Sequence, residues 1–267
     1  MTDGLILNLA AVLALVPASL LGLRRDPGRD GMYWLMLAVA TLGPFTTIMV
    51  SLSGEWHTDL ATSLWATIAA SMILFSVISI LTREAWRLTP LIAIYMIILG
   101  VLATIWSHAG DPQGMGSAGS GAWVGLHIAV SVGTYGLVTI AAVAALGAVF
   151  QERALKIKHQ TPLSRLLPSV ADCDELVVRL LAVSEIVLAL GLFSGMALQF
   201  AESHEILALN HKSILTITAF VVIGGVLIAH YRSGLRGRKA ARIVLLAYLL
   251  LTLGYPGVKF VSDIVIS

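Results

Sequence analysis

Apolar residues recur along this chain in long runs, and short polar stretches separate one run from the next. Eight runs reach the length of about 20 residues that an α-helix needs to cross the roughly 30 Å hydrocarbon core of a bilayer. We place them at about 5–23, 32–52, 60–81, 88–106, 123–150, 176–200, 212–231 and 243–262. The pattern therefore predicts an all-α fold, a polytopic membrane helix bundle with eight transmembrane helices that forms one integral-membrane domain over residues 1–267.

Composition supports this class of protein. Hydrophobic residues make up 58% of the 267 positions and charged residues 12%, whereas soluble domains carry about 25% charged residues. The N-terminus lacks the positive segment of a signal peptide, so we expect the first run to remain as a span. The single cysteine, Cys173, excludes an internal disulfide and a CxxC redox or zinc site. We expect the lipid bilayer as a partner and no nucleic acid.

The basic residues indicate how the chain crosses the membrane. Of the 17 lysines and arginines, all but Lys212 and Lys259 fall in the loops after spans one, three, five and seven or at the start of span six. Basic loops stay in the cytoplasm by the positive-inside rule. The sequence therefore predicts that these loops are cytoplasmic and that both termini are outside.

One span carries a polar stripe. At helical spacing the residues of this stripe share one face of the fifth span, and they are Trp123, His127, Ser131, Thr134 and Tyr135. Polar groups in lipid cost free energy, so this face should meet protein, water or a ligand. We take the stripe as the main indication of function.

Among the seven histidines, His127 differs because it lies inside a span. Neutral imidazole is a good axial ligand for haem iron, which needs one or two such ligands and apolar walls. His57 beside Trp56, and Trp123, lie at the same outer level. Aromatic residues and histidines also gather at membrane boundaries in proteins without any ligand, and this alternative stays open.

Two further histidines bracket the seventh span. His211 and His230 are 19 residues apart, or roughly 28 Å along a helix. One haem cannot use both of them. His211 is a candidate partner for His127, and His230 would belong to a separate site near the cytoplasmic face.

Span six holds one carboxylate, Glu185, well inside the membrane. Acids at such depth are candidates for proton relays or ion ligands. The alternatives are a pair with Arg179 or another helix, or simple protonation. The same span contains Gly191 and Gly195 four residues apart, a spacing that helix packing alone explains.

Several landmarks occur in the order seen in a known family. They are the strings GLHIAVSVGTYGLVTIAAVAAL, QERALKIK, LLPSVADCDELVVRLLAVSEIVLALGLFSG, HKSILTITAFVVIGGVLIAHYRSGLRGRKAA and LLTLGYPGVKF. With these, the chain resembles the integral-membrane cytochrome c assembly family (CcsA/HemX-like). The resemblance covers about residues 120–262, and the spans within 1–106 are generic. The segment AESHEILALNHK lacks the tryptophans of the haem-presenting segment, so the chain is similar to the short HemX-like branch.

The resemblance implies a haem-binding protein that assists cytochrome c assembly or haem handling across the bacterial plasma (inner) membrane. The cofactor implied is haem b, with His127 as the ligand of its iron. His230 matches the inner-membrane histidine of the family, and Lys212 matches its lysine after the outer segment. Other cytochrome assembly or haem-biosynthesis membrane proteins are the partners implied. We expect a non-catalytic assembly factor rather than an enzyme.

Candidate cofactor-binding residues are therefore His127, His57, His211, His230, Trp123 and Tyr135. Two other readings remain. The protein could be a secondary transporter or channel with Glu185 and the polar stripe along its pathway, although no inverted repeat is visible. Alternatively, it could be a regulatory membrane scaffold of haem biosynthesis whose spans dock a partner.

Overall fold

The computed structural model describes residues 2–24, 27–52, 60–107, 122–158, 161–203, 211–235 and 237–254, and at some helix ends it describes only the backbone. Over these residues the chain is helical and contains no strand. The elements are α1 (Thr2–Ser19), η1 (Leu20–Leu23), α2 (Gly31–Leu52), α3 (Leu60–Leu81), η2 (Ala85–Leu88), α4 (Thr89–Trp106), α5 (Ala122–Ile157), α6 (Pro162–Leu166), α7 (Val170–Ser203), α8 (His211–Ser233) and α9 (Arg238–Thr252).

Seven helical stretches in the described residues are long and apolar enough to cross a membrane, and they coincide with the first seven predicted spans. The all-helical membrane fold is thus confirmed. The eighth predicted span, 243–262, is helical in α9 as far as Thr252. Its remainder from residue 255 lies outside the described residues. The count of eight and the location of both termini stay predictions.

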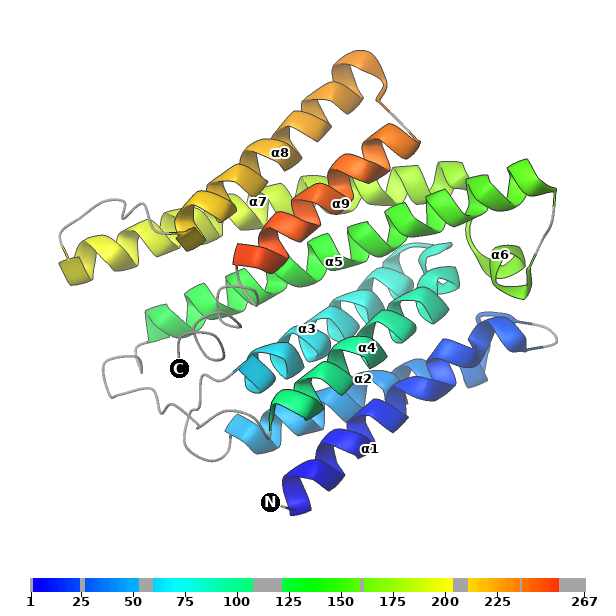
Figure 1. The fold of residues 1–267 in the computed structure, drawn as a ribbon, viewed down its shortest axis with the longest axis horizontal. Coiled ribbons are helices and arrows are strands. Elements are labelled where there is room, and N and C mark those ends of the chain that lie inside the picture. The colour runs from blue at the N-terminus through cyan, green and yellow to red at the C-terminus, as the bar shows by residue number, and fades with distance from the viewer. Residues whose placement is uncertain are drawn as a thin grey trace.

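Helix α5 runs through the middle of the bundle (Figure 1). It packs against α3 and α4 on one side and against α7 and α9 on the other, while α8 lies against α7 and α9. In the apolar stretch of α5, 72% of the residues are buried within the protein, whereas in that of α8 only 17% are buried. Helix α5 is therefore the central element, and α8 is the peripheral one.

Small side chains let the neighbours of α5 approach closely. A Cβ on Gly147 would lie 3.0 Å from Leu88 Cδ2 and 3.5 Å from Cys173 Sγ. Small residues at such positions allow membrane helices to pack by van der Waals contact. Four alanines near Gly147 on α5 are also buried, Ala141, Ala144, Ala145 and Ala148.

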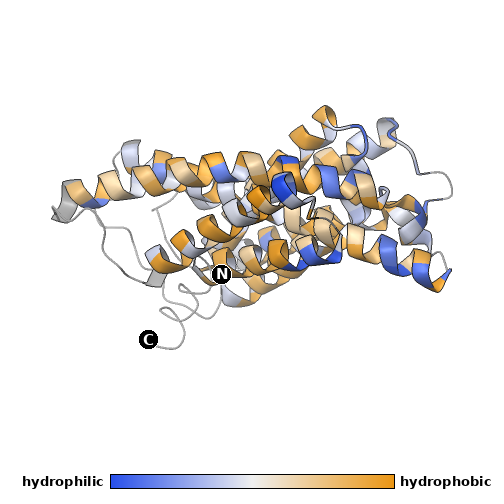
Figure 2. Cartoon of the chain, turned by 90° about the horizontal axis from the view of Figure 1, so that it is seen from above, coloured by the Kyte–Doolittle hydropathy of each residue, from blue (hydrophilic) through white to orange (hydrophobic). Residues whose placement is uncertain are grey.

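Hydrophilic segments gather toward the end of the bundle where α5 ends and α6 lies (Figure 2). At this end Arg24 pairs with Asp30 at 2.8 Å. Asp30 also accepts a hydrogen bond of 2.8 Å from the amide of Tyr33 in the first turn of α2. The hydrogen bonds from Arg24 and then from Tyr33 lower the pKa of Asp30 to about 2. The start of α2 is capped by this carboxylate.

Candidate functional site

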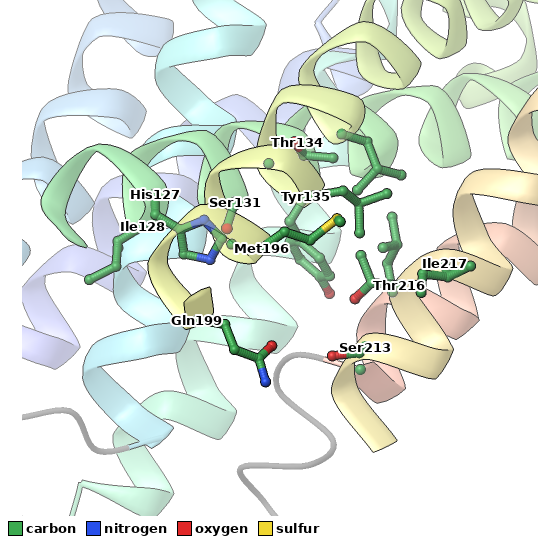
Figure 3. Close-up of a pocket in the computed structure, with 16 residues that line it drawn as sticks. His127, Ile128, Ser131, Thr134, Tyr135, Met196, Gln199, Ser213, Thr216 and Ile217 are labelled. Atoms are coloured by element: carbon green, nitrogen blue, oxygen red, sulfur yellow. The ribbon is translucent and has the colours of Figure 1, made fainter. Parts of the chain in front are cut away.

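A cavity of about 410 Å³ lies between α5, α7 and α8 and reaches the end of α9 (Figure 3). Its volume falls within the range of roughly 300–1,000 Å³ that small-molecule and cofactor sites occupy. Apolar side chains form much of the wall, and the residues concerned are Ile128, Leu188, Leu192, Met196, Ile217 and Leu251. The cavity can therefore hold a largely apolar ligand.

Helix α5 brings most of the polar stripe to this cavity. His127, Ser131, Thr134 and Tyr135 all line it. Trp123 does not, and its side chain is 53% exposed. The helical spacing thus turns four of the five residues of the stripe inward, and Trp123 lies at the beginning of the helix.

One hydrogen bond orients the ring of His127. Nδ1 of His127 lies 2.8 Å from the hydroxyl oxygen of Ser194 on α7. That hydroxyl donates its one hydrogen to the carbonyl of Gly191 at 3.0 Å. When this hydrogen lies on the Gly191 carbonyl, the oxygen of Ser194 accepts from His127 and Nδ1 carries the ring hydrogen. Neutral imidazole then has its lone pair on Nε2, which makes no hydrogen bond with any residue in the described ranges.

Two glycines of α7 make room at the same place. A Cβ on Gly195 would lie 3.0 Å from Cε1 of His127, and one on Gly191 would lie 3.4 Å from Val130 Cγ1. Any larger residue at 195 would push against the imidazole. Gly195 therefore permits α7 to approach α5 with the ring of His127 between them.

Further polar and sulfur-bearing groups face the same space. Met196 and Gln199 come from α7, and Ser213 and Thr216 come from α8. Figure 3 shows the side chains of His127, Met196 and Tyr135 turned toward a common volume, with Gln199 and Ser213 at one end. Hydrogen-bonding groups at one end and apolar walls elsewhere suit an amphipathic ligand.

Tyr135 lines the cavity with its ring while α9 holds its hydroxyl. The hydroxyl of Tyr135 lies 3.0 Å from that of Tyr248 and 3.1 Å from Oγ1 of Thr252. The hydroxyl of Tyr248 also bonds that of Tyr95 on α4. A chain of hydroxyl groups therefore joins α4, α5 and α9 beside the cavity.

The other predicted residues lie elsewhere or cannot be placed. His57 is outside the described residues, and only the backbone of His211 is described, two residues before Ser213. His230 lies near the opposite end of α8, where its Nδ1 donates to the carbonyl of Leu235 at 3.1 Å. The structure brings His127 and Tyr135 together and leaves His230 apart from them.

Glu185 lies one helical turn beyond Leu188 of the cavity wall. Its Oε2 is buried and has no hydrogen-bond partner within the described part of the chain. Its Oε1 faces α8, where a Cβ on Gly224 would lie 2.9 Å away. Arg179 pairs with Glu175 instead, so the alternative of an ion pair between Arg179 and Glu185 is not realised.

Sequence reasoning missed several residues of this site. Ser194, Gly195, Met196 and Gln199 were assigned no role, although Gly191 and Gly195 stood out by their spacing. The glycine spacing was a usable signal, because it marks where another helix or a ligand approaches closely. Nothing in the sequence singles out Ser194 among the serines.

Comparisons with known proteins agree with the fold. The family model described as "Cytochrome C assembly protein" matches residues 32–266. The match therefore begins well before residue 120, where the resemblance seen in the sequence begins. An uncharacterized 28.8 kDa protein in a nifR3-like 5' region of Azospirillum brasilense is 48% identical over the whole of both chains. Inner membrane protein YpjD of Escherichia coli (strain K12) is 24% identical, over 73% of this chain and 72% of that protein.

Proposed function

The chain belongs to the cytochrome c assembly protein family, and we propose that it binds haem b in the cavity around His127. In this role it assists cytochrome c assembly or haem handling in the bacterial inner membrane. The observation that carries the proposal is an imidazole whose Nδ1 is held by Ser194 and whose Nε2 is left with its lone pair beside a cavity.

An imidazole held in this way suits iron. Metal-binding histidines usually donate their other ring N–H to an acceptor, which fixes the tautomer and raises the basicity of the ligand nitrogen. Ser194 provides that acceptor for His127. Haem, when bound, supplies an iron centre that needs only one or two protein ligands. His127 alone can therefore hold it in place.

The walls of the cavity fit the rest of the group. Leu188, Leu192 and Ile217 offer apolar contacts for a macrocycle, and Gln199 and Ser213 offer polar contacts at one end. Gly195 keeps the approach to His127 open. Haem has an apolar ring and carboxylate side chains. The ring matches the apolar walls of the cavity, and the carboxylates match its polar end.

A second axial ligand could come from several residues. Met196 and Tyr135 line the cavity, and thioether and phenolate oxygen both ligate haem iron in proteins. Tyr135 already engages Tyr248 and Thr252 through its hydroxyl, which favours Met196 of the two. His57 and His211 remain candidates as well.

The chain has one thiol, Cys173, and it is fully buried, with 0% of its surface exposed. Attachment of haem to a cytochrome requires reduced cysteines in the apoprotein. We therefore assign the supply of electrons to a partner protein, and to this chain a role in holding haem rather than in thiol chemistry.

The test is the absorption spectrum of the purified protein after loading with haem. We expect a Soret band and a haemochrome signal in the wild type, loss or shift of both in His127→Ala, and little change in His230→Ala. His230→Ala is the matched control because it removes an imidazole at the other end of the spans. A wild-type protein that stays colourless after loading would refute the proposal.

One observation favours a second candidate, a proton or ion pathway. The buried Oε2 of Glu185, which has no partner among the described residues, lies just beyond the cavity. An ionised carboxylate at such depth is costly unless it is paired or protonated, so the group is a candidate for a proton relay or an ion ligand. Flux into proteoliposomes that is abolished by Glu185→Gln, with the His127→Ala variant unchanged, would support this candidate instead of haem binding.

A further inference from the structure

A second crevice lies at the basic end of the molecule, between the last turns of α5 and the first turns of α9. Its volume is about 520 Å³. Leu146, Val149, Ile157 and Leu245 provide an apolar floor, and the four cations that complete the lining are Arg153, Lys156, Arg238 and Arg242. The crevice therefore has an apolar inner surface, and the charged ends of four basic side chains lie at its border.

Most of this charge has no partner in the part of the chain that the structure describes. Arg238 pairs with Glu152 at 2.8 Å, which also ties α9 to α5. Arg153, Lys156 and Arg242 form no ion pair or hydrogen bond with any residue that the structure describes. Three cations with no acceptor among the described residues thus border one crevice, and such a cluster attracts anions.

Helical spacing places the apolar and charged groups at successive depths. On α5, Leu146, Val149, Arg153 and Lys156 follow one face over 10 residues, or about 15 Å. On α9, Arg238 and Arg242 come first and Leu245 follows one turn later. The crevice therefore passes from the charged boundary of the bundle into its apolar zone along both helices.

We propose that this crevice binds an anionic phospholipid whose headgroup carries two phosphates, the chemistry of cardiolipin. The phosphates contact Arg153, Lys156 and Arg242, and an acyl chain lies over Leu146, Val149 and Leu245. Basic pockets between membrane helices accept such headgroups. A soluble anion would use the cations and leave the apolar floor without a role, so the lining favours a lipid.

The lipid would also add a link between two helices that pack together and that, among the described residues, share one ion pair at this end. Glu152 and Arg238 link α5 and α9 here, and phosphates between Arg153 on α5 and Arg242 on α9 would add a second link. Because α9 carries Tyr248 and Leu251 beside the haem cavity, the lipid would stabilise the wall of that cavity. Binding of the lipid does not depend on haem.

The experiment titrates the delipidated, full-length protein with cardiolipin, phosphatidylglycerol and phosphatidylcholine and follows binding by native mass spectrometry and the shift in melting temperature. We expect cardiolipin to bind most tightly. Each unpaired cation should contribute about 5-fold in affinity, so Arg153→Gln with Arg242→Gln should weaken binding roughly 25-fold. The double variant Arg153→Lys and Arg242→Lys keeps the charge and should retain binding. Retained binding would show that the glutamine variant loses affinity through its lost charge and not through misfolding.

The matched control removes the same charge outside the crevice. Lys239 lies on α9 between two lining residues without lining the crevice, and Arg179 pairs with Glu175 on α7. Lys239→Gln with Arg179→Gln should change affinity less than twofold. An equal loss in this control would assign binding to diffuse surface charge and overturn the proposal. Equal stabilisation by inorganic phosphate would also overturn it, by identifying a site for free anions.

Discussion

At the scale of single residues, the site depends on one hydroxyl group. Ser194 donates to the Gly191 carbonyl of its own helix and accepts from Nδ1 of His127. This arrangement leaves only Nε2 of the neutral imidazole able to ligate a metal. Without the hydroxyl the ring could rotate or change tautomer. The orientation of the His127 ring is therefore set from α7, although His127 belongs to α5.

Removing this hydroxyl should weaken haem binding without unfolding the protein. Loss of the acceptor behind a metal-binding histidine typically costs about 10- to 100-fold in affinity, and we expect a loss in this range for Ser194→Ala in a haem titration. Ser184→Ala is the control, because the Ser184 hydroxyl bonds only Leu180 of its own helix. Similar losses in both variants would mean that Ser194 does not act through His127.

Gly195→Ala tests the space beside the ring. Its Cβ would lie 3.0 Å from Cε1 of His127, so the imidazole must move by a few tenths of an ångström. We expect weaker haem binding and a melting temperature that stays the same or rises, because alanine favours a helix by up to about 1 kcal/mol over glycine. Gly225→Ala, with open space around it, should leave haem affinity unchanged. Unaltered affinity in Gly195→Ala would count against the assigned role of Gly195.

At the scale of the helices, hydroxyl groups hold the cavity wall together. Tyr95 on α4, Tyr135 on α5 and Tyr248 on α9 form one hydrogen-bonded chain, which Thr252 extends. These hydroxyls lie in the apolar interior, where water cannot replace a lost partner. The chain therefore helps to fix α9, whose Leu251 closes part of the cavity.

A double-mutant cycle of Tyr135→Phe and Tyr248→Phe should show coupling. Hydrogen bonds between membrane helices contribute about 0.6 kcal/mol on average and up to roughly 1.7 kcal/mol, and we expect a coupling energy of this size in the free energy of unfolding. Tyr33→Phe with Tyr248→Phe is the control pair, since Tyr33 on α2 takes no part in the chain. Additive effects for Tyr135 and Tyr248 would exclude the hydroxyl link.

The spans could be predicted from the sequence because a run of apolar residues long enough to cross a bilayer has few alternatives. The segments that connect the spans were harder to predict. Between α5 and α7, Pro162 begins the short helix α6, and Thr161 and Ser164 cap it. Proline is compatible with the first turn of a helix. Helix α7 begins at Val170, before the predicted start of the sixth span at residue 176, because Ser169 and Asp172 cap it reciprocally.

The site could be predicted only on the helix that carries a periodic polar pattern. On α5 that pattern led to His127, Ser131, Thr134 and Tyr135, which all line the cavity. The contributions of α7 and α8 depend on which faces of separate helices meet, and spacing within one span does not contain this information. Ser194 and Met196 therefore needed the three-dimensional arrangement.

At the scale of the whole molecule, α5 separates two groups of helices. Helices α1 to α4 pack among themselves, and α7 to α9 form the other group (Figure 1). The cavity around His127 is lined by α5 and by helices of the second group, with Gly254 just after α9. The first group thus supports α5 from the opposite side and contributes to the site through Tyr95, which bonds Tyr248.

The orientation of the molecule remains a prediction that labelling can test. The native Cys173 is buried and should not react, so single added cysteines report their own side. We expect a membrane-impermeant maleimide to label Thr2→Cys in spheroplasts and to label Arg165→Cys only after permeabilisation, because basic loops remain cytoplasmic. The reverse pattern would invert the topology and move the His127 cavity to the cytoplasmic side.

The most direct measurement of the central claim is rescue of His127→Gly by free imidazole. Removal of the side chain empties the position of the imidazole ring, and added imidazole can occupy it beside Ser194. We predict that the haem-loaded variant has an altered Soret band, and that imidazole restores the wild-type band in a saturable manner. A variant that shows the wild-type spectrum before any imidazole is added would contradict the assignment of His127 as the ligand.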